Sequence, residues 1–143
     1  LVMKLIFFLL LFSPLNFILL NENLDSCNGI DNYIFGTSKD SFKNMSLEFE
    51  EGNSQLYTLN SDAIKISGVQ FDFIRITFIK NKLSAISLST KGDTRAAFFK
   101  YLKDKYGAPI KNKNRFEWNG KLVKIVFEFY NNSKDAAVDF YKK

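Results

Sequence analysis

The sequence predicts an α+β domain in which two helices pack on one face of an antiparallel sheet of about five to six strands. One segment, Asp93 to Tyr106, repeats apolar residues at helical spacing. Most of the remaining chain consists of short segments that alternate apolar and polar residues, as strands do. Asn119-Gly120, between two such segments, is a strong hairpin signal. The 143 residues fit one domain.

The first predicted helix is short and runs from about Ser38 to Ser46. Ser38 supplies a hydroxyl for the N-cap, and Phe42 and Met45 lie three residues apart on one face. The acidic stretch 48–51 precedes Gly52 and is predicted to be a solvated loop.

Alternation predicts the next strands, which cover residues 55–59, 64–67, 69–79 and 83–90. Within 69–79, apolar residues occupy alternate positions up to Phe73 and the opposite positions from Ile74 onward. A strand cannot point both sets at one core without a bulge, so a bulge is expected near Phe73-Ile74. Asn81-Lys82 is the predicted turn before the last of these strands.

The second helix, Asp93 to Tyr106, has the clearest boundaries in the sequence. Asp93 can cap its start, and Phe98 and Leu102 belong to its apolar stripe. Gly107 supplies a left-handed residue after its last turn, and Pro109 prevents continuation.

The C-terminal part is predicted to be a hairpin followed by a short last strand or a terminal turn, Ala136 to Tyr141. A two-residue turn at Asn119-Gly120 would pair Trp118 with Lys121 and Phe116 with Val123. This register places the aromatic residues of the first strand on the apolar face of the second.

Residues 1–27 are predicted to be a signal peptide or an N-terminal anchor, and residues 28–143 a single α+β domain. Lys4 precedes the uncharged run Leu5 to Leu20, which is the pattern of a secretory leader. Pro14 near the middle of the run favours a leader over a stable membrane-spanning helix.

Leu24-Asp25-Ser26-Cys27 is similar to the lipobox of bacterial lipoproteins, with a departure at Asp25. Cys27 is therefore a candidate lipidation site, and the alternative is an unpaired thiol in an N-terminal tail. The expected location is outside the cytoplasm: periplasmic, secreted or membrane-anchored by lipid.

The chain is basic, with 20 lysine and arginine residues against 15 acidic residues. The basic residues are spread along the chain and only three are arginine, so nucleic acid is not expected as a partner. The expected partner is an envelope protein or a membrane surface.

Composition excludes several kinds of catalysis. The chain has no histidine and one cysteine, so imidazole-based mechanisms and thiolate metal clusters are excluded. Glu48, Glu50 and Glu51 form the one local group of carboxylates, and Asp72 lies between two phenylalanines. No phosphate-binding loop, nucleophile motif or calcium loop is present. We predict no catalytic residue, no cofactor and no metal.

Phe35-Gly36-Thr37-Ser38, the segment 79–83 and Lys105-Tyr106-Gly107-Ala108-Pro109 together resemble uncharacterised exported proteins of Bacteroidetes-type bacteria. More remotely, they are similar to the SmpA/OmlA small lipoproteins and the β-lactamase-inhibitor-like fold. The resemblance covers most of residues 33–130 and implies binding rather than catalysis.

The predicted function is that of a small exported binding or interaction module of the cell envelope. Two alternatives stay open: a carrier of an apolar ligand between sheet and helices, and a hydrolase that uses glutamate with lysine or tyrosine. A cavity would favour the carrier if it were lined by Phe71, Phe73, Phe98, Phe127 and Phe129. By strand parity, the side chains available to a partner are Tyr57, Asp72, Arg75, Tyr101, Glu117 and Tyr130.

Overall fold

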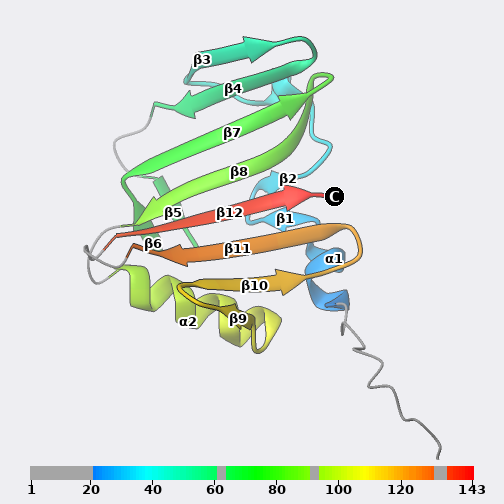
Figure 1. Cartoon of the computed structure of the whole chain (residues 1–143). Coiled ribbons are helices and arrows are strands. Elements are labelled where there is room, and N and C mark those ends of the chain that lie inside the picture. The colour runs from blue at the N-terminus through cyan, green and yellow to red at the C-terminus, as the bar shows by residue number, and fades with distance from the viewer. Residues whose placement is uncertain (1–20, 61–63, 91–93, 131–134) are drawn as a thin grey trace, which may run out of the picture.

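The structure is a computed structural model that describes residues 21–60, 64–90, 94–130 and 135–143 (Figure 1). Its main feature is an eight-stranded antiparallel sheet in the order β3-β4-β7-β8-β12-β11-β10-β9. The first four strands are β3 (Met45–Glu51), β4 (Ser54–Leu59), β7 (Phe73–Ile79) and β8 (Lys82–Thr90). The others are β9 (Ile110–Asn112), β10 (Arg115–Asn119), β11 (Val123–Phe129) and β12 (Ala136–Lys142).

Smaller elements pack against one face of this sheet. They are α1 (Glu22–Cys27), β1 (Gly29–Ile30), β2 (Tyr33–Ile34), the 3₁₀ turn η1 (Lys39–Ser41), β5 (Ile64–Ile66), β6 (Val69–Phe71) and α2 (Thr94–Tyr106). Figure 1 shows α2, β5, β6 and the N-terminal elements behind the sheet, while its front face is left open by the described residues. We call these the covered face and the open face.

The predicted fold class is therefore wrong. In its described residues the protein is mostly β, with one substantial helix and a larger sheet than expected. The predicted helix Ser38 to Ser46 is only the turn η1, whose N-cap Ser38 makes no side-chain capping bond. The chain then becomes extended, because the inner edge of β3 pairs with β4 from Met45 to Glu51, with one register shift.

The acidic stretch 48–51 is likewise part of β3 and not a loop. A register shift between Leu47 and Phe49 in the β3–β4 pair lets Glu48 reach across the open face. Gly52, with a φ of 55°, provides the turn into β4.

The bulge predicted near Phe73-Ile74 is not formed, because the chain instead changes sheets at Asp72 and the register shift of the β7–β8 pair lies between Thr77 and Phe78. β6 ends at Phe71, which is buried, and pairs with β5 in a separate two-stranded sheet. β7 starts at Phe73, whose side chain lies on the open face opposite Ser89. The chain thus changes sheets where the apolar pattern changes parity. The following turn uses Lys80 and Asn81, both with positive φ, instead of Asn81-Lys82.

The core lies between the covered face and α2, β6 and the N-terminal elements. The largest fully buried side chains there include Trp118, Phe78, Phe98, Phe127 and Phe140. Helix α2 matches the predicted segment except at Asp93, which lies outside the described residues. Gly107, with φ of 79°, donates its N–H to the Lys103 carbonyl at 2.8 Å and ends the helix as expected.

Strand β12 joins the two halves of the sheet. It pairs with β8 on one side and with β11 on the other, so the C-terminal strand lies in the middle of the sheet. The predicted final strand is thus confirmed, and its position unites two meanders into one sheet.

Candidate functional site

The sheet ends at β9, and beside this edge α2 and the β10–β11 hairpin form a groove. Its floor includes Phe99 from α2 and Phe129 from β11, and Phe116 from β10 packs beside them; all three rings are half-buried. Phe99 packs on Phe116 with ring centroids 4.7 Å apart, and Phe116 packs on Phe129 at 5.4 Å. The adjacent hollow has a volume of about 460 Å³. It is lined by Arg95, Ala96, Phe99, Lys100, Lys103, Asp104 and Phe129.

Each of the three packed rings has a cation above it. The Arg95 guanidinium carbon lies 4.9 Å from the Phe129 centroid. The Lys103 ammonium lies 6.0 Å from the Phe99 ring, and the Lys111 ammonium 5.8 Å from the Phe116 ring. These distances are within the range of cation–π attraction. We call the three rings and three cations the aromatic–cationic groove.

The local sequence explains why these rings lie at the surface of the core and not inside it. Phe98 and Phe99 are neighbours on α2, and helical geometry turns Phe98 into the core and Phe99 toward the hairpin. Phe116 and Phe129 lie at the outer end of the β10–β11 ladder. Asn114 fixes this end, since its amide donates to the Phe129 carbonyl at 2.9 Å and its carbonyl accepts from the Phe129 N–H at 3.0 Å.

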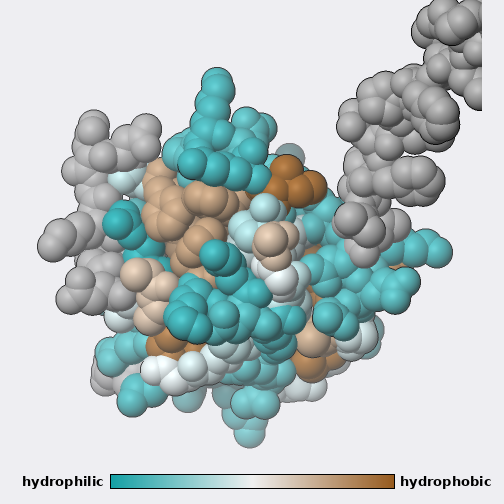
Figure 2. Space-filling view, turned by 90° about the horizontal axis from the view of Figure 1, so that it is seen from below, coloured by the Kyte–Doolittle hydropathy of each residue, from teal (hydrophilic) through white to brown (hydrophobic). Residues whose placement is uncertain are grey.

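The electrostatics of the groove favour anions. Arg95, Lys103 and Lys111 surround the floor, and the lining residue Asp104 is paired with Lys100 one helical turn away. Figure 2 views this end of the molecule and shows apolar side chains gathered among hydrophilic ones. An apolar floor with a cationic rim fits a ligand that carries both apolar groups and negative charge.

The open face of the sheet is polar and internally paired. The Arg75 Nε lies 2.8 Å from Glu48, which also accepts from Thr58. Farther along, the Lys124 Nζ lies 2.7 Å from Glu117. The hydrogen bond from Lys124 lowers the pKa of Glu117 against the opposing effect of burial. Because these charges are already paired, the open face is a weaker candidate for recognition.

The grouped carboxylates of the sequence are not brought into one catalytic arrangement. Glu48 points to the open face, whereas Glu50 belongs to the covered side, where it accepts from the Gln55 amide at 2.8 Å. Asp72 is exposed between β6 and β7. Within the described part of the chain, no cluster of three or more histidine, cysteine, aspartate or glutamate side chains is placed to hold a metal ion.

The alternation of side chains along the predicted strands identified only some of the exposed residues. Tyr130 and Arg75 are exposed, and Arg75 is in the ion pair with Glu48. Tyr57 instead lies half-buried on the covered side, with its ring 5.7 Å from that of Phe78. Tyr101 stacks on Phe98 at 5.6 Å and accepts a hydrogen bond from Lys105.

The cavity expected for a carrier is not formed by its predicted residues. Phe71, Phe98 and Phe127 are buried, and Phe71 and Phe98 are in ring contact at 4.8 Å. Phe73 lies on the opposite face of the sheet. Phe129 alone among the five lines the groove.

Cys27, the candidate lipidation site, is the last residue of α1 and packs half-buried against the core. Leu24 is fully buried and Asp25 is bonded to the turn between β10 and β11. Residues 21–27, assigned above to the leader or anchor, therefore contact the domain.

Comparisons of the chain with protein-family models, curated proteins and solved structures give no match. Among the helices that the structure describes, none has the length and apolar character required to cross a bilayer. The candidate site therefore rests on geometry. The groove was not predicted from the sequence, although the shared face of Phe116, Trp118, Phe127 and Phe129 was a signal for an aromatic cluster.

Proposed function

We propose that the protein is an interaction module that binds an acidic, extended segment of a partner protein in the aromatic–cationic groove. The observation that carries this proposal is the coincidence of half-exposed rings with cations above them. The three cations sit at 4.9, 6.0 and 5.8 Å from three mutually packed phenylalanines. Apolar side chains of a partner would replace water on the rings, and its carboxylates would pair with Lys103 and Lys111.

The neighbouring edge strand supports an extended ligand. Among the described residues, β9 pairs only with β10, so its outer backbone groups can accept a further strand. Lys111 links the two features, because it belongs to β9 and lies above Phe116. A strand added to β9 would send alternate side chains into the groove.

The proposed partner is a protein of the cell envelope. The uncharged run Leu5 to Leu20 supports export, and a hollow groove suits a peptide better than a membrane surface. If a leader is removed, we propose that cleavage falls before Asn21, because a cut before Cys27 would remove buried Leu24 and bonded Asp25. Mass spectrometry of the mature chain tests this point, and acylated Cys27 at the N-terminus would refute it.

A labelled octapeptide of alternating glutamate and phenylalanine tests the binding function. Fluorescence anisotropy at low salt should show binding, and an alternating lysine and phenylalanine peptide should bind far more weakly. Lys103→Glu should raise the Kd about tenfold or more, whereas Lys80→Glu, on the distant β7–β8 turn, should leave the Kd unchanged. Equal binding of the acidic peptide by wild type and Lys103→Glu would overturn the proposal.

A further inference from the structure

We propose that a second copy of this chain supplies the acidic segment, so that edge strand β3 of one copy pairs with edge strand β9 of the next. This inference rests on the proposed function, because it names the occupant of the aromatic–cationic groove. It is supported by the chemistry of β3, by the directions of the strands and by the faces on which their side chains lie.

β3 has the composition that the groove favours. Between Met45 and Glu51 it contains three glutamates and no basic residue, in a chain whose net charge is +5. Its apolar residues Leu47 and Phe49 are 50% and 56% exposed. Within the described residues β3 pairs only with β4, so its outer backbone edge is available to another strand.

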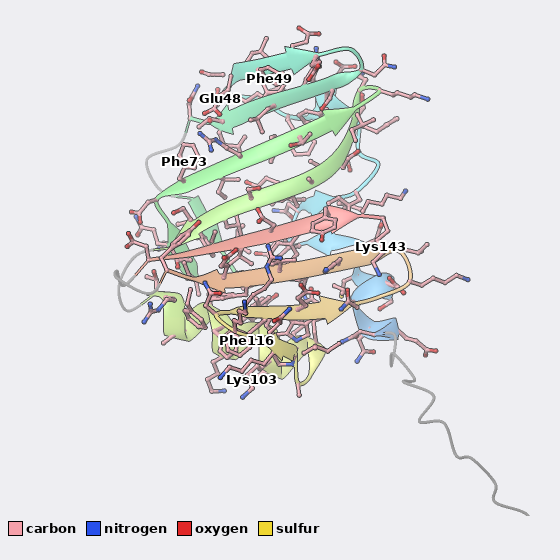
Figure 3. The ribbon with its side chains drawn as sticks, viewed as in Figure 1. Glu48, Phe49, Phe73, Lys103, Phe116 and Lys143 are labelled. Atoms are coloured by element: carbon pink, nitrogen blue, oxygen red, sulfur yellow. The ribbon has the colours of Figure 1, made fainter. Side chains whose placement is uncertain are left out.

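The opposite edge of the sheet has the complementary character. β9 and the residue after it read Ile110-Lys111-Asn112-Lys113, and Ile110 is exposed. Figure 3 shows Glu48 and Phe49 at one end of the sheet and Lys103 and Phe116 at the other. The two edges of one chain cannot meet, since six strands separate them. Pairing must therefore be intermolecular.

Strand directions allow the sheet to continue from copy to copy. Every neighbouring pair in the eight-stranded sheet is antiparallel, so its two edge strands run in opposite directions. A second copy in the same orientation then places its β3 antiparallel to β9 and keeps the covered faces on one side. The contact uses two different surfaces and extends without closing by symmetry.

The side chains match on both faces in this arrangement. The strand registers put the side chains of Leu47 and Glu50 of β3 on the covered side, and that of Lys111 of β9 on the same side. An apolar and an acidic residue of one copy therefore approach the groove of the next. On the open face, Phe49 of β3 approaches Ile110 of β9. The register shift ends before Phe49, so Phe49 to Glu51 form a regular stretch as long as β9.

Charge also selects against the alternative pairing of β3 with β3. An antiparallel pair of two β3 strands would bring glutamates of both copies side by side, which is unfavourable. Pairing with β9 instead places Glu50 and Glu51 near lysines. The assembly is therefore head-to-tail and joins two unlike edges.

Sedimentation of charge-swapped chains tests the assembly. The wild type should associate as concentration rises at low salt and dissociate at high salt. Glu50→Lys with Glu51→Lys makes both edges basic, and Lys103→Glu with Lys111→Glu makes both edges acidic. Each variant should be monomeric alone, with association weakened about tenfold or more. An equimolar mixture should associate again, because each basic edge then meets an acidic one.

Circular dichroism establishes that both variants are folded, and Lys142→Glu, an exposed position on the central strand β12, serves as the matched charge control. A wild type that stays monomeric at millimolar concentration, or a mixture that fails to associate, overturns the head-to-tail pairing. If the alternating glutamate and phenylalanine peptide still binds in that case, the groove remains a binding site for acidic segments, and only the proposal that a second copy of the chain occupies it is refuted. If neither peptide binding nor self-association is observed, both the proposed binding function and the head-to-tail pairing are refuted.

Discussion

The carboxylate of Asp25 accepts a 2.7 Å hydrogen bond from the backbone N–H of Leu122, 97 positions further along the chain. The same carboxylate accepts from Lys121 at 2.5 Å and from Val123 at 3.0 Å. Three consecutive N–H groups of the β10–β11 turn thus converge on one side chain of α1. This contact holds the N-terminal helix against the hairpin that bears the groove.

Asp25→Asn should lower the free energy of unfolding by about 2 to 3 kcal/mol, because charge-assisted hydrogen bonds are lost and an amide hydrogen meets the N–H groups. Urea unfolding at neutral pH measures the change. Glu22→Gln, on the exposed side of the same helix, should change it by less than about 0.5 kcal/mol. Equal effects of the two substitutions would contradict the stabilising role of the Asp25 hydrogen bonds.

The Asp25 contact should also make stability depend on pH. Burial raises the pKa of this carboxyl, but the hydrogen bonds from Leu122, Lys121 and Val123 outweigh burial and leave the pKa below its ordinary value of 3.8. Its stabilisation is therefore complete above that value and is lost as pH falls through the lower folded pKa. The Tm difference between wild type and Asp25→Asn should shrink at acid pH, and a constant difference would contradict this linkage.

Gly120→Ala should destabilise the protein through the same contact. A Cβ at Gly120 would lie 2.2 Å from the Asp25 Oδ1 and 3.0 Å from the Val123 carbonyl oxygen. We expect a loss of about 2 kcal/mol. In a double-mutant cycle with Asp25→Ser, which shortens the side chain, the two losses should not add, and strict additivity would exclude the clash as the cause.

Chains that start at Asn21 and at Asn28 should differ in stability. Removal of residues 21–27 takes fully buried Leu24 out of the core, which alone costs about 3 kcal/mol. The shorter chain should therefore have the lower Tm in calorimetry. Equal Tm values would show that α1 is dispensable and would support the predicted boundary at residue 28.

Trp118→Phe should cost about 1 to 2 kcal/mol, because Trp118 Nε1 donates a 2.8 Å hydrogen bond to the Gly107 carbonyl at the end of α2. The loss should appear in chemical unfolding monitored by circular dichroism. Phe116→Leu, which keeps an apolar side chain in the groove, should cost less than Trp118→Phe while weakening peptide binding more. The reverse order would contradict the separate roles of core and groove.

Local signals were sufficient for some elements. The apolar stripe and Gly107 located α2, and alternation located β4, β8 and β12, because helical and strand periodicity depend on neighbouring residues. The hairpin after Asn119 was also expected, but its register was wrong. Trp118 pairs with Ile125, not Lys121. Because the register differs by four positions, an even number, the same residues still lie on the covered face, and the predicted facing of the side chains was correct.

By itself, the sequence determined the position of α2, the alternation of the strands and the absence of histidine chemistry, since these depend on composition and spacing. Only the tertiary structure decided the hairpin register, which follows the Asp25 bonds to the turn, and the extended state of β3, which follows its pairing with β4. It also decided the groove, because Phe99, Phe116 and Phe129 come from three elements that meet only when long-range packing places α2 beside the hairpin. Local preference could not specify these features, since the free energy that selects them comes from contacts between distant residues.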